Sequence, residues 1–216
     1  MSGLKLYTFD QLDCGEVIRL ILLQGGKKFN DVRIKREEWP KLKDQTPWGA
    51  LPVLEVDGKK LAGTIAIAEY LGDNLGMAAG GTAWDRAQLN SICDAVLEAT
   101  IFLSHYWSEK DPSLKAQKKA EVLKNSVPCQ LAKINKRIEE NGSPDGFICS
   151  NRLTYADFFV RFLFCDVLTH VYALEEQRKE AEKYPAVSKL CKTVHNLPNI
   201  KKYLDSRPDT GVHWDP

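Results

Sequence analysis

A cation, a backbone edge and a helix start follow one another in the N-terminal third of this chain. Trp39 and Lys43 lie in one segment, Leu51-Pro52 opens an apolar strand, and Thr64 stands where a new helix begins. A cis X-Pro bond bends the chain and can expose the preceding N–H and C=O to a peptide. Free N–H groups and the dipole at a helix start attract carboxylates. This order predicts a site for a small peptide that is acidic at both ends.

Each of these residues also has a purely structural interpretation. Pro52 can simply begin a strand, where its missing N–H costs nothing. Thr64 can cap its own helix, which is compatible with binding, and Trp39 and Lys43 can be ordinary surface residues. The ordered set therefore supports the ligand interpretation, whereas no single member does.

The elements that position these residues alternate between strand and helix through residue 75. Asp57-Gly58 is a strong hairpin signal between two strands, and Gly25-Gly26 ends a short apolar helix. The order βαβ-loop-ββα predicts an α/β thioredoxin-like domain over residues 1–75. The expected elements are strands at 4–9, 29–34, 53–56 and 60–62 and helices at 16–24 and 64–74.

The pattern changes after residues 76–81, which are a glycine-rich linker candidate. No strand signal returns over residues 82–216, so the second domain is predicted to be all-α. Thr154 to Asp157 has the form of a capping box at a helix start. The expected helices span 84–107, 113–141, 155–174, 175–182, 184–196 and 198–204.

Composition and charge exclude several classes of partner and cofactor. The 216 residues carry 30 basic and 29 acidic side chains, so no long-range field favours nucleic acid or a membrane surface. The sequence shows neither a signal-peptide core nor an apolar run long enough to span a membrane. The cysteines form no CxxC pair and no zinc pattern, which predicts reduced thiols, a cytoplasmic protein and no metal. They are Cys14, Cys93, Cys129, Cys149, Cys165 and Cys191.

A family resemblance is carried by six segments spread along nearly the whole chain, namely residues 33–34, 39–43, 47–58, 66–71, 154–157 and 202–208. Together they resemble the cytosolic glutathione transferases, most closely the sigma class, which includes prostaglandin D synthases and lens S-crystallins. The resemblance implies the glutathione transferase fold and a homodimer. It also implies glutathione as co-substrate, bound in the N-terminal domain of each subunit.

The resemblance assigns roles to the residues of the predicted peptide site. Trp39 and Lys43 would contact the glycyl end of glutathione, and Leu51 would hold the cysteinyl backbone beside a cis Pro52. Thr64 replaces the family's usual Ser at the γ-glutamyl carboxylate. Gly63 stands where the family often has Gln, and an acid on the first helix of the second domain would reach the partner subunit's glutathione. The implied set is Trp39, Lys43, Ala50, Leu51, Pro52, Gly63, Thr64, Asp94 and Glu98.

The group that would activate the glutathione thiol is altered in this chain. A thiol with a pKa of about 8.5 is mostly protonated at neutral pH, so a transferase must favour the thiolate. Sigma enzymes use a Tyr eight residues before a Glu at the helix start, but here Thr8 precedes Glu16 by eight. Some related classes use a Ser or Thr hydroxyl, so Thr8 is the predicted donor. Tyr7 is the fallback, and only if the strand register slips, because neighbouring strand residues face opposite sides.

The loop before Glu16 has lost both arginines of the family's Arg-Gly-Arg-Ala-Glu motif and reads Leu12-Asp13-Cys14-Gly15. Cys14 lies near a helix N-terminus, where a thiol pKa falls. Omega-class relatives use a cysteine for glutathione-dependent reduction, but their cysteine would stand at Leu12. Cys14 is therefore a third candidate for a reacting group, after Thr8 and Tyr7, and would make the protein a glutathione-dependent reductase.

Two functions follow from the resemblance. The first is glutathione transfer to a hydrophobic electrophile, or its glutathione-assisted isomerisation, as in detoxification or prostanoid synthesis. The alternative is a non-enzymatic ligand carrier or a crystallin-type structural protein, because the usual Tyr and the arginines are missing. The candidate wall of the second substrate, which is equally interpretable as core, comprises Phe102, His105, Tyr106, Trp107, Val212, His213 and Trp214.

Overall fold

The computed structural model describes residues 3–78, 80–168, 179 and 181–207 of the chain. These residues divide into two compact units. In their described parts, unit 1 comprises residues 3–78 and 195–207, and unit 2 comprises residues 80–168, 179 and 181–194. The chain thus returns to its N-terminal unit after the helical part, whereas the sequence led us to expect all of residues 82–216 in the second domain.

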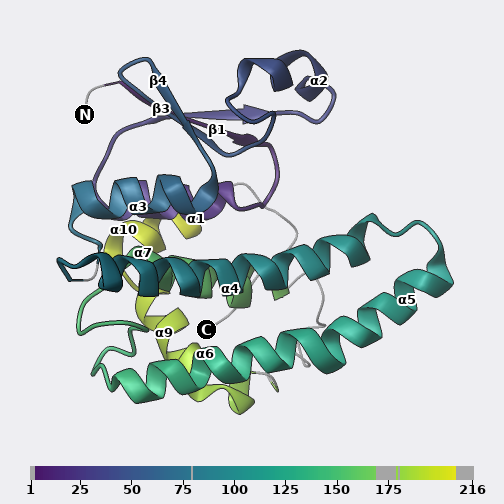
Figure 1. Ribbon diagram of the computed structural model, residues 1–216, viewed down its shortest axis with the longest axis vertical. Coiled ribbons are helices and arrows are strands. Elements are labelled where there is room, and N and C mark those ends of the chain that lie inside the picture. The colour runs from purple at the N-terminus through teal and green to yellow at the C-terminus, as the bar shows by residue number, and fades with distance from the viewer. Residues whose placement is uncertain (1–2, 79, 169–178, 180, 208–216) are drawn as a thin grey trace. The chain divides into compact units, whose positions relative to one another are not determined.

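A four-stranded sheet forms the centre of unit 1 (Figure 1). The strand order is β2-β1-β3-β4, with β1 parallel to β2 and antiparallel to β3, as a thioredoxin-like domain requires. Helices α1 and α3 pack against each other on one face of the sheet (Figure 1). The elements are β1 (Leu4–Phe9), α1 (Gly15–Gln24), β2 (Asn30–Ile34), α2 (Trp39–Leu42), β3 (Val53–Val56), β4 (Lys59–Ala62) and α3 (Thr64–Leu75).

Strand β1 alternates strictly between buried and half-buried residues. Leu4, Leu6 and Thr8 are buried, whereas Tyr7 on the intervening face is half-buried. The period of two follows from strand geometry, because successive side chains point to opposite faces. Thr8 therefore belongs to the same buried row as two core leucines.

The predicted hairpin at Asp57-Gly58 is confirmed. Asp57 has φ 49° and Gly58 has φ 82°, the left-handed pair that a two-residue turn between twisted strands requires. The turn joins β3 to β4 in the register Val56↔Lys59.

Unit 1 is completed by α10 (Pro198–Leu204), which packs on α1. The residues that follow α10 extend this contact, because Arg207 reaches a side chain on α1. A segment almost 200 positions away thus supports the first helix of the chain.

Unit 2 consists of helices in its described part, as predicted. The long segment expected at 113–141 is α5 (Pro112–Glu121), a π-helical turn (Val122–Ser126) and α6 (Val127–Asn141). Pro128 explains the wider turn, because its ring clashes with the carbonyl four residues earlier and it offers no N–H. The other helices are α4 (Ala83–Ser108), α7 (Tyr155–Arg161) continued by a second π-helical turn (Phe162–Val167), and α9 (Pro185–His195).

The helix expected at 175–182 lies mostly outside the described residues. Among the helices that the structure describes, none combines the length and apolarity that crossing a bilayer would need.

Candidate functional site

Thr8 lies under the start of α1. Its side chain is fully buried, and its hydroxyl accepts a hydrogen bond from Nη2 of Arg19 at 3.0 Å. A Cβ atom on Gly15 would lie 2.2 Å from the Thr8 methyl group, so only glycine allows this approach. Thr8 is a packing residue in this conformation, and its placement does not support the expected contact with a thiol.

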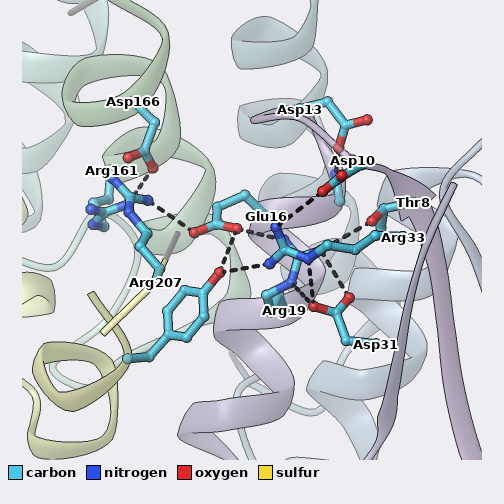
Figure 2. A network of polar contacts seen from close by, with 12 residues as sticks. Thr8, Asp10, Asp13, Glu16, Arg19, Asp31, Arg33, Arg161, Asp166 and Arg207 are labelled. Atoms are coloured by element: carbon cyan, nitrogen blue, oxygen red, sulfur yellow. Dashed lines mark hydrogen bonds and ion pairs between the residues drawn. The ribbon is translucent and has the colours of Figure 1, made fainter. Parts of the chain in front are cut away.

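A buried network of charges surrounds Arg19 (Figure 2). Arg19 and Glu16 are each only 2% exposed, and Arg19 Nη1 lies 2.5 Å from Glu16 Oε2. The Nε and Nη2 atoms of Arg19 donate to the two oxygens of Asp31, each at 3.0 Å. Tyr203 donates to Glu16 Oε2 at 3.1 Å, and Arg207 Nη1 donates to Glu16 Oε1 at 3.0 Å. Each buried charge thus has hydrogen-bonded partners of opposite sign, which offsets the cost of burial.

Tyr7 faces the other side of the sheet. Its hydroxyl donates to Glu55 Oε2 at 3.0 Å, and Lys5 Nζ lies 2.8 Å from the other oxygen of that carboxylate. The pairings Tyr7↔Val32 and Tyr7↔Val53 continue the register of β1 with both neighbours. The slip that would bring Tyr7 to the position of Thr8 does not occur.

The backbone edge predicted at Leu51-Pro52 lies next to the start of α3. The Leu51–Pro52 bond is cis, and the Gly63 N–H donates to the Pro52 carbonyl at 3.4 Å. Thr64 is the first residue of α3 rather than its N-cap, which corrects the expectation from sequence. The cap is Gly63, because its carbonyl accepts from Ile67 N at 3.0 Å and its φ of 99° is strained for any other residue.

Trp39 and Lys43 lie on the short α2 and on the 3-10 turn Lys43–Gln45 that follows it. The half-buried Trp39 ring meets Phe9 edge-on, with ring centroids 5.3 Å apart. The stem of Lys43 runs along Gly49, where an added Cβ would lie 3.0 Å from Lys43 Cε. The ammonium group of Lys43 is thereby held near the loop that leads to the exposed Ala50 and to Leu51.

Besides the exposed Asp10, the loop between β1 and α1 holds two ionisable groups, Asp13 and Cys14. Burial and the neighbouring charge of Asp13 raise the pKa of Cys14 to about 12, although a hydrogen bond with the Thr64 side chain opposes this shift. The expectation that Cys14 has a lowered pKa is therefore wrong, because desolvation outweighs the helix start. Asp13 Oδ1 accepts from Gly15 N at 2.8 Å, and burial raises the pKa of Asp13 to about 6.

In unit 2, Asp94 and Glu98 are exposed one turn apart on α4, between the buried positions Cys93, Val96 and Ala99. His105 on the same helix is exposed. Val212, His213 and Trp214 lie outside the described residues, as do the side chains of Phe102 and Trp107. Within the described parts of both units, no three His, Cys, Asp or Glu side chains gather as metal ligands would.

The network around Arg19 was not predicted from the sequence. A signal was present, because Glu16 and Arg19 interrupt an otherwise apolar helix at a spacing of three, which places them on one face. Their partners Tyr203 and Arg207 carried no such signal, because they lie 187 and 191 positions from Glu16.

Comparison with known proteins agrees with this fold. Residues 2–73 match the model of the glutathione S-transferase N-terminal domain, and residues 99–207 match that of the C-terminal domain. The chain is 36% identical over 189 residues to glutathione S-transferase 2 of Manduca sexta, covering 88% of this chain and 89% of that protein. It is 32% identical over 212 residues to a glutathione S-transferase of Anopheles gambiae, covering 98% and 100%.

Solved structures agree as well. A prostaglandin synthase D of Nilaparvata lugens superposes with a TM-score of 0.84 at 31% identity, covering 96% of this chain and 99% of that one. The glutathione S-transferase of Ascaris lumbricoides does so with a TM-score of 0.74 at 35% identity, covering 96% and 98%. The chain therefore belongs to the glutathione S-transferase family, an enzyme family that uses glutathione, and the predicted fold is confirmed.

Proposed function

We propose that this protein transfers glutathione to hydrophobic electrophiles, with glutathione lying across the Leu51-Pro52 edge and the start of α3. The observation that carries the proposal is the hydrogen bond from Gly63 N to the Pro52 carbonyl, which joins the two features. Among the described residues, no side chain caps α3 and its first turn contains no acid. The N–H groups of that turn are therefore available to a carboxylate.

The chemistry of glutathione matches the order of groups along this edge. The γ-glutamyl carboxylate would accept from the first N–H groups of α3 and from the Thr64 hydroxyl. The cysteinyl backbone would pair with Leu51, whose main chain bonds to no other backbone group in the described part of the chain. Lys43 would neutralise the glycyl carboxylate, and Trp39 would cover the apolar portion.

The proposal includes a cytoplasmic homodimer of sigma-class type. Trp48 precedes β3 and is 79% exposed, which is unusual for the largest apolar side chain. We assign it to the dimer contact, where an aromatic ring contributes most when it fills a partner's pocket. The exposed Asp94 and Glu98 on α4 would then serve the glutathione of the other subunit.

Binding of glutathione is tested by titration calorimetry and by retention on immobilised glutathione. Lys43→Ala is expected to weaken binding about two- to fivefold, since an exposed ion pair contributes up to about 1 kcal/mol. Lys41→Ala on the exposed part of α2 is the matched control and should bind as the wild type does. If neither heat nor retention is detected with the wild-type protein, the proposal fails.

A second candidate function is a binding protein that does not catalyse. The placement of Thr8 favours it, because the hydroxyl expected to activate the thiol is buried on Arg19. The two candidates are separated by assaying conjugation with an aryl halide and with several other electrophiles. Glutathione binding with no conjugation rate above background would show that the protein is a non-catalytic binding protein. Measurable turnover would exclude that function.

A further inference from the structure

The turn that carries Lys43 is tied to the sheet by a second lysine. Lys60 on β4 donates from Nζ to the Gln45 carbonyl at 3.0 Å. We propose that Lys60 is a positioning residue, which holds the Lys43 ammonium group where the glycyl carboxylate of glutathione binds. The inference rests on the proposed function, because it needs glutathione at the Leu51-Pro52 edge.

Local hydrogen bonds join the turn to the end of α2. The Lys43 carbonyl accepts from Thr46 N at 3.1 Å and from the Thr46 hydroxyl at 2.7 Å. The side-chain amide of Gln45 donates to the Lys41 carbonyl at 3.1 Å. Residues 41–46 thus form one hydrogen-bonded piece, so a bond to the Gln45 carbonyl also restrains the backbone of Lys43.

Lys60 provides the polar link between this piece and the sheet. In the described part of the chain, the bond from Lys60 is the hydrogen bond of residues 41–46 that reaches a strand. Helix α2 lies on the side of the sheet away from α1 and α3 (Figure 1). Its other contact with a strand is the edge-on packing of Trp39 on Phe9, with ring centroids 5.3 Å apart. That contact holds the start of α2, whereas Lys60 holds the turn after its end.

The ammonium group of Lys60 is itself held by the neighbouring strands. Its Nζ lies 5.8 Å from the centroid of the Tyr7 ring, within the range of a cation–π contact. Glu55 stands directly across from Lys60 in the register of β3 and β4. Hydrogen bonds from Lys5 and Tyr7, together with the charge of Lys60, lower the pKa of Glu55. An aromatic ring and a carboxylate therefore favour the Lys60 cation at the place from which it reaches the turn.

Lys60→Met tests the role, because methionine keeps much of the apolar stem but has no donor for the Gln45 carbonyl. In titration calorimetry we expect it to weaken glutathione binding about two- to threefold, which does not exceed the loss expected for Lys43→Ala. Lys59→Met, which removes the same charge from an exposed neighbour on β4, is the matched control and should bind as the wild type does. Adding Lys60→Met to Lys43→Ala should cause no further loss, because the side chain that Lys60 positions is then gone.

Glutathione amide, whose glycyl end is uncharged, separates positioning from a merely structural role. Its affinity should be equal in Lys60→Met and wild type, because it offers Lys43 no carboxylate. If Lys60→Met binds glutathione as the wild type does, loses affinity for both ligands alike, or loses no more than Lys59→Met, the role of Lys60 is overturned and the proposed function stands. A wild type that binds no glutathione overturns both.

Discussion

Replacing Asp157 by Ala should remove a large part of the stability of unit 2. Asp157 is fully buried at the start of α7. Its Oδ1 accepts from Ile148 N at 2.9 Å, and its Oδ2 accepts from Thr154 N at 2.7 Å and from the Thr154 hydroxyl at 2.8 Å. Alanine would leave these three donors buried without an acceptor.

The magnitude follows from that count of donors. An unsatisfied buried donor costs about 1–3 kcal/mol, and the hydroxyl can rotate toward another acceptor, so the loss should be about 3–5 kcal/mol. A domain of ordinary size is stable by about 5–15 kcal/mol, so the variant should unfold at clearly lower urea concentration.

The chain contains its own matched control in the capping box of α4. Asp85 accepts from Thr82 N at 3.2 Å and from the Thr82 hydroxyl at 2.7 Å, but this box is exposed. Water can replace the lost acceptor there, so Asp85→Ala should cost only about 0.5–1 kcal/mol. Equal losses for the two variants in equilibrium urea unfolding would refute the argument that burial sets the cost.

Asp157 also gives the stability a pH dependence. Burial raises its pKa to about 6, above the 3.8 of an ordinary aspartate in the unfolded chain. The folded state therefore binds more protons between about pH 4 and 6, so the contribution of this group to stability falls as the pH rises through that window. The shift corresponds to about 3 kcal/mol, and Asp157→Asn should unfold with a flatter dependence on pH over the same range.

Three further predictions concern unit 1 and the cysteines. Thr8→Val should lower the free energy of urea unfolding by about 1–3 kcal/mol, because it removes an acceptor of Arg19, but it should change kcat less than threefold. A hundredfold loss of kcat would show that the Thr8 hydroxyl takes part in catalysis. A thiol-reactive disulfide reagent at pH 8 should react first with the exposed Cys129 and slowly with Cys14. Cys129→Ser should therefore abolish the fast phase of the reaction, whereas Cys14→Ser should leave it unchanged. Trp48→Ala should shift sedimentation toward the monomer, and an unchanged dimer would place the contact elsewhere.

Local patterns in the sequence predicted the elements of unit 1 well. The alternation in β1, the Asp57-Gly58 turn and the glycines that end α1 each act within a few residues, so a short segment contains the whole signal. The capping box at Thr154 was equally readable, because its two members lie three positions apart.

The states of the reacting groups were not readable in the same way. The sequence placed Thr8 and Tyr7 on opposite faces of one strand. Only the packing against Gly15 and the hydrogen bond from Arg19 show that the Thr8 hydroxyl is buried. Cys14 sits at a helix start, as expected, yet desolvation raises its pKa instead of lowering it. Local position set the direction of each side chain, whereas the groups brought in by folding set its exposure and its ionisation.

By itself the sequence determined the two-part architecture, which follows from periodicity. The family, and the residues that border the proposed glutathione edge, followed from the resemblance of short motifs. Tertiary structure alone decided that Tyr203 and Arg207 close the network on Glu16, and that residues 195–207 join the first unit. The physical reason is that burial and charge compensation depend on which groups meet in space. Residues separated by 187 or 191 positions leave no trace of that meeting in a local pattern.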